Sequence, residues 1–199
     1  MHRTRRHRIL LVGVAIVFAW SAVAPHDRAT WWMEVAPVLI GLPILWATHR
    51  RFPLTPLLEW LLAIHAIVLI VGGHYSYALV PAGDWFRDLM GWRRNPYDRF
   101  GHLMQGFVPA ILTREILLRQ LDLRRRGWLF FLVLCVCLAF SAFYELLEWW
   151  AAEIAGDGAQ DFLGTQGDIW DAQWDMFLAA IGAIVAQILL AKVHDRQLP

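Results

Sequence analysis

The chain has 199 residues, of which 58% are hydrophobic, and its mean hydropathy is +0.44. Soluble domains are about 45–50% apolar, and here the excess is arranged in blocks of nearly the ~20 residues that a helix needs to cross hydrocarbon. The composition therefore excludes an ordinary soluble domain. The net charge of +1 gives no long-range attraction to nucleic acid, so we expect membrane lipids and not nucleic acid as partners.

The apolar blocks predict an all-α, polytopic membrane helix bundle that forms one integral membrane domain over residues 1–199. Six transmembrane helices are expected at residues 9–24, 31–48, 57–80, 100–118, 128–152 and 170–192. The first has an alternative, because a basic leader, a short apolar run and Ala22-Val23-Ala24 are typical of a cleaved signal peptide. Pro25 directly after that site obstructs cleavage, so we favour an uncleaved helix.

The arginines predict the orientation of the spans. Basic residues lie in the leader and after the second, fourth and sixth spans. The fifth connection has no basic residue and carries the acidic residues Asp157, Asp161 and Asp168. This alternation is the positive-inside pattern, and it predicts that both termini are cytoplasmic. One segment, 81–99, places four arginines on the predicted outer side. Within it, residues 84–90 are expected to form a short interfacial helix that ends at Gly91.

Acidic residues and a histidine recur at the predicted outer ends of three spans. They fall at helical spacings that put each set on one face: Asp98 with His102; Glu145 with Glu148; Asp168 with Asp171 and Asp175. A charge at the bilayer centre costs about 2.5–3.5 kcal/mol on insertion scales, so such residues persist mainly where they pair or serve a site. The three sets are therefore expected to line one pocket.

Carboxylates and imidazole facing inward from several helices are how bundle proteins build metal sites. Zinc, manganese, magnesium and calcium all accept this donor set, so a divalent metal is the expected cofactor without a choice among them. The predicted metal ligands are Asp98, His102, Glu148 and Asp171. Glu145 and Asp175 are predicted as catalytic bases or as groups that orient the ligands.

Each of these residues also has a structural interpretation. Asp98 and Asp168 would serve as helix caps, and the two glutamates would pair with Arg94 or Arg99 across the same membrane face. His74, near the outer end of the third span, is typical of a hydrogen-bonded core or interfacial histidine. The convergence of six or more costly residues favours a functional pocket over these separate explanations.

Three functions remain open. The first is a metal-dependent enzyme that acts on a lipid or lipid-linked substrate at the outer leaflet, with metal activating water or polarising a phosphoryl or acyl group. The second is an ion- or proton-coupled transporter, which would need polar residues toward the inner face. Only Arg114 and Glu115 lie there in the last three spans, and snorkelling accounts for them. The third is a structural or partner-binding membrane protein.

Three motifs carry a family resemblance. They are Tyr97–His102 (YDRFGH), Ser141–Trp149 (SAFYELLEW), and Phe162–Asp168 (FLGTQGD) continuing through Trp170–Met176 (WDAQWDM). They resemble the YjdF-type bacterial inner-membrane proteins, and the resemblance implies a six-helix protein of the bacterial inner membrane without supplying a reaction. A weaker likeness is to VanZ-like membrane proteins, whose pattern has an amide and an asparagine where this chain has Glu148 and Asp175. The site here is more acidic, which favours a cation.

Overall fold

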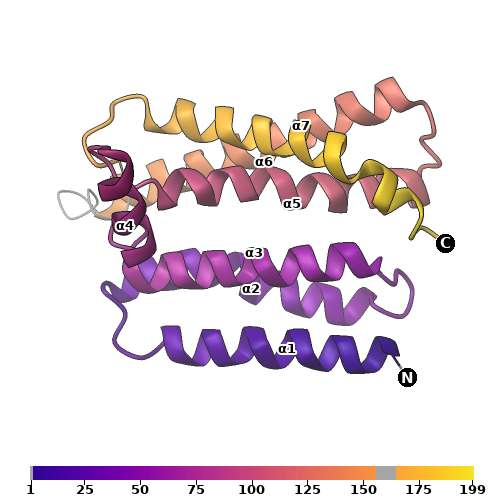
Figure 1. The fold of residues 1–199 in the computed structure, drawn as a ribbon, viewed down its shortest axis with the longest axis horizontal. Helices are drawn as coiled ribbons and strands as arrows, with labels where there is room; N and C mark the ends of the chain where they lie inside the picture. Colours follow the sequence, from indigo (N-terminus) through magenta and orange to yellow (C-terminus); the bar gives the residue numbers. More distant parts are fainter. Residues whose placement is uncertain (1, 156–164) are drawn as a thin grey trace. The chain divides into compact units, whose positions relative to one another are not determined.

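A computed structural model describes residues 2–155 and 165–199, and all regular structure in them is helical. The helices are α1 (His2–Ser21), α2 (Arg28–Thr48), α3 (Pro56–Tyr75), α4 (Pro81–Met90), α5 (Tyr97–Gln120), α6 (Arg126–Ala155) and α7 (Asp171–Asp195), as Figure 1 shows. The all-α prediction is confirmed. Asp157 and Asp161, which were assigned to the fifth connection, lie outside the described residues.

Four of the described helices, α2, α3, α6 and α7, are long and apolar enough to cross a membrane. Helices α1 and α5 have 20 and 24 residues, which is also sufficient length, but both carry several charged residues. In α1 these form the basic leader, and in α5 they lie toward the two ends. The membrane bundle is therefore established, whereas the count of six spans and the cytoplasmic termini stay predictions.

The third helix is shorter than the expected span 57–80, because α3 ends at Tyr75. Ser76 and Tyr77 adopt left-handed backbone angles, with φ of 54° and 48°, and this conformation stops the helix. Pro81 then begins α4, where its missing N–H costs no hydrogen bond. The sequence pattern was misleading here because the apolar residues continue through the turn.

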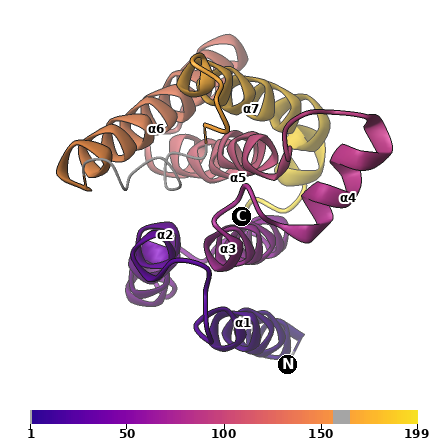
Figure 2. The same cartoon turned by 90° about the vertical axis from the view of Figure 1, so that its left-hand side faces the viewer.

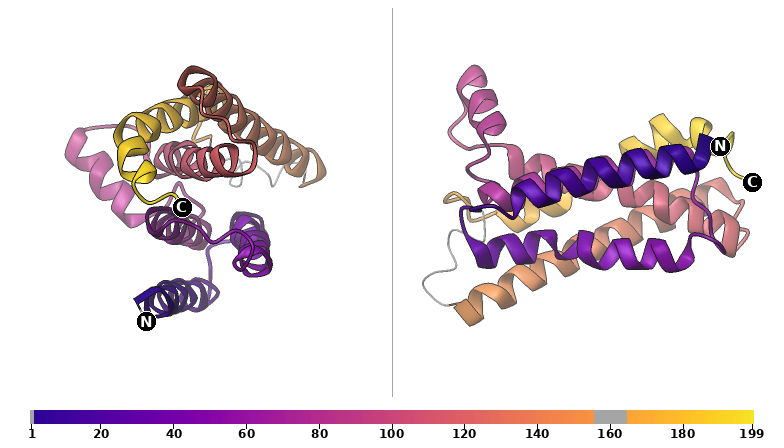
Figure 3. Two further views of the ribbon diagram at one scale, coloured as in Figure 1. Left: turned by 90° about the vertical axis from the view of Figure 1, so that its right-hand side faces the viewer. Right: turned by 90° about the horizontal axis from the view of Figure 1, so that it is seen from below.

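The chain divides into two compact units, Met1–Tyr97 and Asp98–Pro199, and each is described by itself. That residues 1–199 act as one membrane domain stays a prediction. In the first unit, α1 and α2 both pack on α3 (Figures 2 and 3). Their shared core is Val14, Trp31, Val35, Val38 and Ile70.

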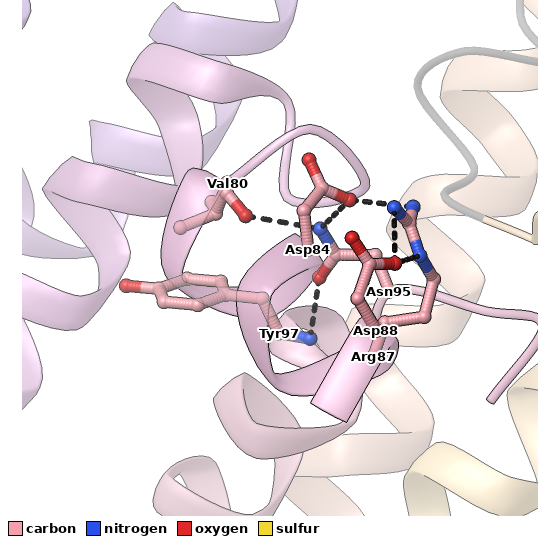
Figure 4. A network of polar contacts seen from close by, with 6 residues as sticks. All are labelled: Val80, Asp84, Arg87, Asp88, Asn95 and Tyr97. Carbon is pink, nitrogen blue, oxygen red and sulfur yellow. Dashed lines mark hydrogen bonds and ion pairs between the residues drawn. The ribbon is translucent and has the colours of Figure 1, made fainter. Parts of the chain in front are cut away.

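Helix α4 confirms the expected short amphipathic helix before Gly91, whose φ of 65° ends it. Its apolar residues, Trp85, Phe86, Leu89 and Met90, are exposed, as an interfacial helix requires. Figure 4 shows what fixes the start of α4 to the start of α5: buried Asn95 donates to Val80 O and to Asp84 Oδ1, both at 3.0 Å, and accepts from Tyr97 N at 3.0 Å. Arg87 pairs with Asp84 and Asp88 in the same network, which offsets part of the basic charge of residues 81–99.

The second unit consists of α5, α6 and α7. Helices α5 and α7 approach backbone to backbone, because a Cβ atom on Gly106 would lie 1.8 Å from Ala179 O and one on Gly182 would lie 2.1 Å from Leu103 O. Small residues allow such close helix packing in membranes. This contact fixes the polar residues at both ends of α5 against those of α7.

Candidate functional site

His102 is the centre of the acidic cluster in the second unit. It lies on α5 one turn after Asp98, and both residues are buried, at 6% and 8% exposure. His102 Nε2 is 3.6 Å from Asp98 Oδ1 and 3.8 Å from Asp175 Oδ2. On the other side of the ring, Nδ1 is 2.8 Å from Gln105 Oε1. The imidazole therefore has two carboxylates near one nitrogen and an amide at the other.

Helix α7 supplies two aspartates to the cluster. It begins at Asp171, so Asp171 and Asp175 are one turn apart on one face, and both are buried, at 6% and 2% exposure. Carboxylates in the first turn of a helix are favoured by the helix dipole. The close approach of α7 to α5 at Gly182 then brings Asp175 to His102.

Glu145 completes the cluster from α6. Its Oε1 lies 3.7 Å from His102 Nδ1, and within the described residues this buried oxygen has no hydrogen-bond partner. Electrostatic repulsion from Asp98, Asp171 and Asp175 also acts on Glu145. Three carboxylates from three helices thus lie within 3.8 Å of one imidazole, an arrangement that is costly unless a proton or a cation compensates the charge.

The arrangement suits a metal ion. One ligand atom from each of Asp98, His102 and Asp175 can be chosen so that all three lie within 4.8 Å of one another. A proton on Nδ1, donated to Gln105 Oε1, leaves the lone pair of Nε2 directed toward the same two aspartates. The donor set of two carboxylates and one imidazole fits zinc, manganese or magnesium.

The sequence-predicted residues are only partly brought together in this way. Asp98 and His102 are adjacent as expected, and Asp175 joins them although it had been assigned to proton transfer. Asp171 is buried at the start of α7, and Glu148 lies half-buried one turn beyond Glu145. The ligand roles predicted for Glu148 and Asp171, and the catalytic roles of Glu145 and Asp175, stay predictions.

Asp168 does not share the α7 face with the other two aspartates, because it precedes the helix. It accepts from Trp170 N at 2.9 Å, in a local turn, and pairs with Arg99 Nη2 at 2.8 Å. Arg99 also lies over the ring of Trp174, 5.1 Å from its centroid. Arg99 therefore pairs with an aspartate at the edge of the cluster.

A second buried network, which the sequence reasoning missed, lies at the opposite end of α5 and α7. Arg114 Nη1 is 2.8 Å from His194 Nδ1, and His194 Nε2 is 3.0 Å from Glu115 Oε2. Glu115 and His194 are completely buried and Arg114 is 7% exposed, so snorkelling is the wrong explanation for Arg114 and Glu115. Arg114 lies about five turns into α5 and His194 about six turns into α7, so spacing places both toward the far ends of their helices but does not pair them.

His74, in the first unit, has the structural role that its position indicated. Its Nδ1 lies 3.0 Å from Ser21 O, and its ring lies against Trp20 with centroids 4.3 Å apart. These contacts brace α1 against α3. Nothing in them requires a ligand.

Comparison with known proteins agrees with the membrane architecture. A family described as "Predicted membrane protein (DUF2238)" matches residues 6–196. The chain is 52% identical over 201 residues to inner membrane protein YjdF of Escherichia coli (strain K12), an alignment that covers 100% of this chain and 96% of that protein. No solved structure matches. The chain is a multi-pass protein of the bacterial inner membrane, and it belongs to the predicted membrane protein family DUF2238.

Proposed function

We propose that the cluster around His102 binds a divalent cation and uses it in chemistry on a lipid or lipid-linked substrate at the outer membrane face. The observation that carries the proposal is the excess of buried carboxylates over cationic groups around one imidazole. A cation would compensate that charge. Without one, the carboxylates would have to repel one another or take up protons.

The two sides of the His102 ring suggest different roles for the surrounding carboxylates. His102 Nε2, Asp98 and Asp175 lie on one side of the imidazole and are the proposed ligands. Glu145 faces Nδ1 on the other side, so it is the proposed general base or the group that orients the imidazole. Asp171, at the start of the same helix as Asp175, and Glu148 are proposed as further acidic groups that tune the site.

A metal held by three protein ligands keeps positions open for water and substrate, and it makes the bound water more acidic. An apolar groove beside the cluster supports the proposed substrate class. Trp174, next to Asp175 in sequence, lines an apolar groove of about 290 Å³ together with Trp170, Gln173 and Phe177. Such a groove suits the apolar part of a lipid, with the polar group to be transformed held toward the acidic cluster.

Metal analysis of the detergent-purified protein tests the proposal. We expect one divalent metal per chain in the wild type, and loss of that metal in His102→Ala and in Asp175→Asn. Glu145→Gln should keep the metal, since Glu145 is not a proposed ligand. Glu153→Gln, an exposed position on the same helix as Glu145, is the matched control. Wild-type protein that is metal-free and equally stable in chelator would refute the proposal.

One observation favours a transporter as the second candidate. The Arg114–His194–Glu115 network adds buried ionisable groups at the far ends of the same two helices, α5 and α7. The close contact between those helices at Gly106 and Gly182 separates the two clusters, so transport would require α5 and α7 to move apart. Cation or proton flux into proteoliposomes that Asp175→Asn abolishes would favour this candidate.

A further inference from the structure

A cavity of about 480 Å³ lies among α1, α2 and α3, in the unit that does not contain the acidic cluster. Its volume is in the range of small-molecule sites. The lining residues are predominantly apolar and come from all three helices, among them Leu10, Val14, Pro37, Gly41, Leu62 and Ala66. End-on views show α1 and α2 beside α3 (Figures 2 and 3).

The depth of the cavity matches one leaflet of a bilayer. Along α3 the lining runs from Glu59 to Leu69, which at 1.5 Å per residue is about 15 Å. The hydrocarbon core of a membrane is about 30 Å thick. The cavity is therefore about half as long as that thickness, which is the length of a single acyl chain in one leaflet.

The end of the cavity at Glu59 is polar and basic. His7, Thr48 and His49 line it there, and Glu59 already forms an ion pair with Arg6 at 2.5 Å and contacts His7 at 2.7 Å. Four further arginines at the same helix ends are exposed: Arg5, Arg8, Arg50 and Arg51. Helices α1 and α3 also begin at this end, so the positive ends of two helix dipoles add to the basic charge.

Two details indicate unfilled space in the cavity. A Cβ atom added to Gly41 would meet no other atom within 4 Å, although Gly41 is a lining residue. His65 also lines the cavity, and within the described residues its Nε2 makes no hydrogen bond. A wholly apolar occupant would leave that nitrogen without a partner, whereas an occupant with an ester group brings a hydrogen-bonding group to the cavity.

We propose that this cavity binds one acyl chain of an anionic phospholipid, with the phosphate at the basic end formed by His7, His49, Arg50 and Arg51. The depth of the cavity, its apolar lining and the basic charge at one end all fit a phospholipid. That lipid would come from the leaflet whose headgroups lie at the basic end. A polybasic rim selects anionic over zwitterionic headgroups. This site is separate from the acidic cluster, and it does not depend on metal binding there.

Native mass spectrometry of the full-length protein in detergent tests the proposal, with phosphatidylglycerol and phosphatidylcholine of identical acyl chains as probes. We expect one phosphatidylglycerol per chain, bound more tightly than phosphatidylcholine by about tenfold or more, from the attraction of the basic residues. Gly41→Phe should abolish this bound lipid by filling the cavity. Gly13→Phe, at a glycine of α1 that also has open space but does not line the cavity, should retain it.

The double variant Arg50→Gln with Arg51→Gln tests the headgroup separately and leaves the cavity intact. It should bind the two lipids with similar affinity, because the cavity holds the chain while the arginines select the phosphate. Three results would overturn the proposal: equal binding of both lipids by the wild type, unchanged binding by folded Gly41→Phe, or a protein dimer that Gly41→Phe dissociates. The last would identify the occupant as a second copy of the chain.

Discussion

The two ends of α5 carry similar ionisable residues, but the distances between their polar atoms differ. At the Arg114 end, polar atoms of Arg114, Glu115 and His194 approach at 2.8 and 3.0 Å, which are hydrogen-bonding distances. At the Asp98 end, the carboxylates of Asp98 and Asp175 stand 3.6 and 3.8 Å from His102. The groups at the Arg114 end hydrogen-bond to one another. The two carboxylate–imidazole distances at the Asp98 end are longer than a hydrogen bond.

The charges differ as well. The Arg114 end balances Glu115 and Asp195 against Arg114 and Arg119, so its groups satisfy one another. The Asp98 end sets several carboxylates against one imidazole. Buried charges are tolerated when they are paired, and the Arg114 end carries as many arginines as carboxylates in its ion pairs. The comparison therefore indicates a structural role for the Arg114 end, and it is consistent with the binding role proposed for the Asp98 end.

The largest expected effect is at the Arg114 end. Glu115→Ala leaves Arg119 and His194 without their shared carboxylate, which should cost about 3–5 kcal/mol of unfolding free energy, as for other broken buried pairs. Chemical denaturation in detergent would measure the loss. Asp122→Ala breaks the exposed Asp122–Arg124 pair instead and should cost less than about 1 kcal/mol. Equal losses would contradict a structural role for the buried network.

The Asp98 end should respond to metal. Divalent metal at 100 times its dissociation constant should raise the unfolding free energy by about 2.7 kcal/mol. Asp175→Asn should abolish this gain, because it removes a proposed ligand and one of the opposed charges. In chelator the same variant should be at least as stable as the wild type, since removing a like charge relieves repulsion. A variant that is less stable in chelator would show that charge repulsion does not dominate at Asp175.

The close contact between α5 and α7 at Gly106 should affect both protein stability and metal binding. Gly106→Leu places a side chain where the backbone of Ala179 lies and should cost about 1–3 kcal/mol, as overpacking does. It should also weaken metal binding, because Asp175 would move away from His102. Gly127→Leu, at a position with no other atom within 4 Å of a Cβ, is the control. Metal affinity that survives a destabilising Gly106→Leu would separate the site from the α5–α7 contact.

Helical periodicity was sufficient to predict that Asp98 and His102 share one face, because residues one turn apart do so whatever the tertiary structure. The approach of Glu145 from α6 was expected instead from its place at the same predicted membrane face. It failed for Asp168, which lies before α7, since a helix start cannot be located to within three residues from spacing alone. It also failed for His194 with Glu115, whose contact depends on how far α5 and α7 slide along each other. That register is set by the Gly106 and Gly182 contacts, which carry no charge pattern.

The smallest expected effect on stability concerns Asp27, whose carboxylate accepts a hydrogen bond from the backbone. Asp27 caps α2 by accepting from Thr30 N at 2.7 Å, and this hydrogen bond lowers the pKa of Asp27. Because the pKa is lowered in the folded state, the stabilisation is present above the unfolded value of about 3.9 and is lost as pH falls below it.

Asp27→Ala should therefore cost about 1 kcal/mol at neutral pH, and the difference from the wild type should shrink on acidification toward pH 3. Asp27→Asn keeps the acceptor without the charge, so it should retain most of the stability and lose the pH dependence. Denaturation curves of the three proteins at several pH values would measure both. A wild type whose advantage over Asp27→Ala grows in acid would contradict the cap. Asp27 should therefore stabilise the fold when its carboxylate is charged and hydrogen-bonded. For Asp175 in chelator we expect the reverse, because its charge adds repulsion.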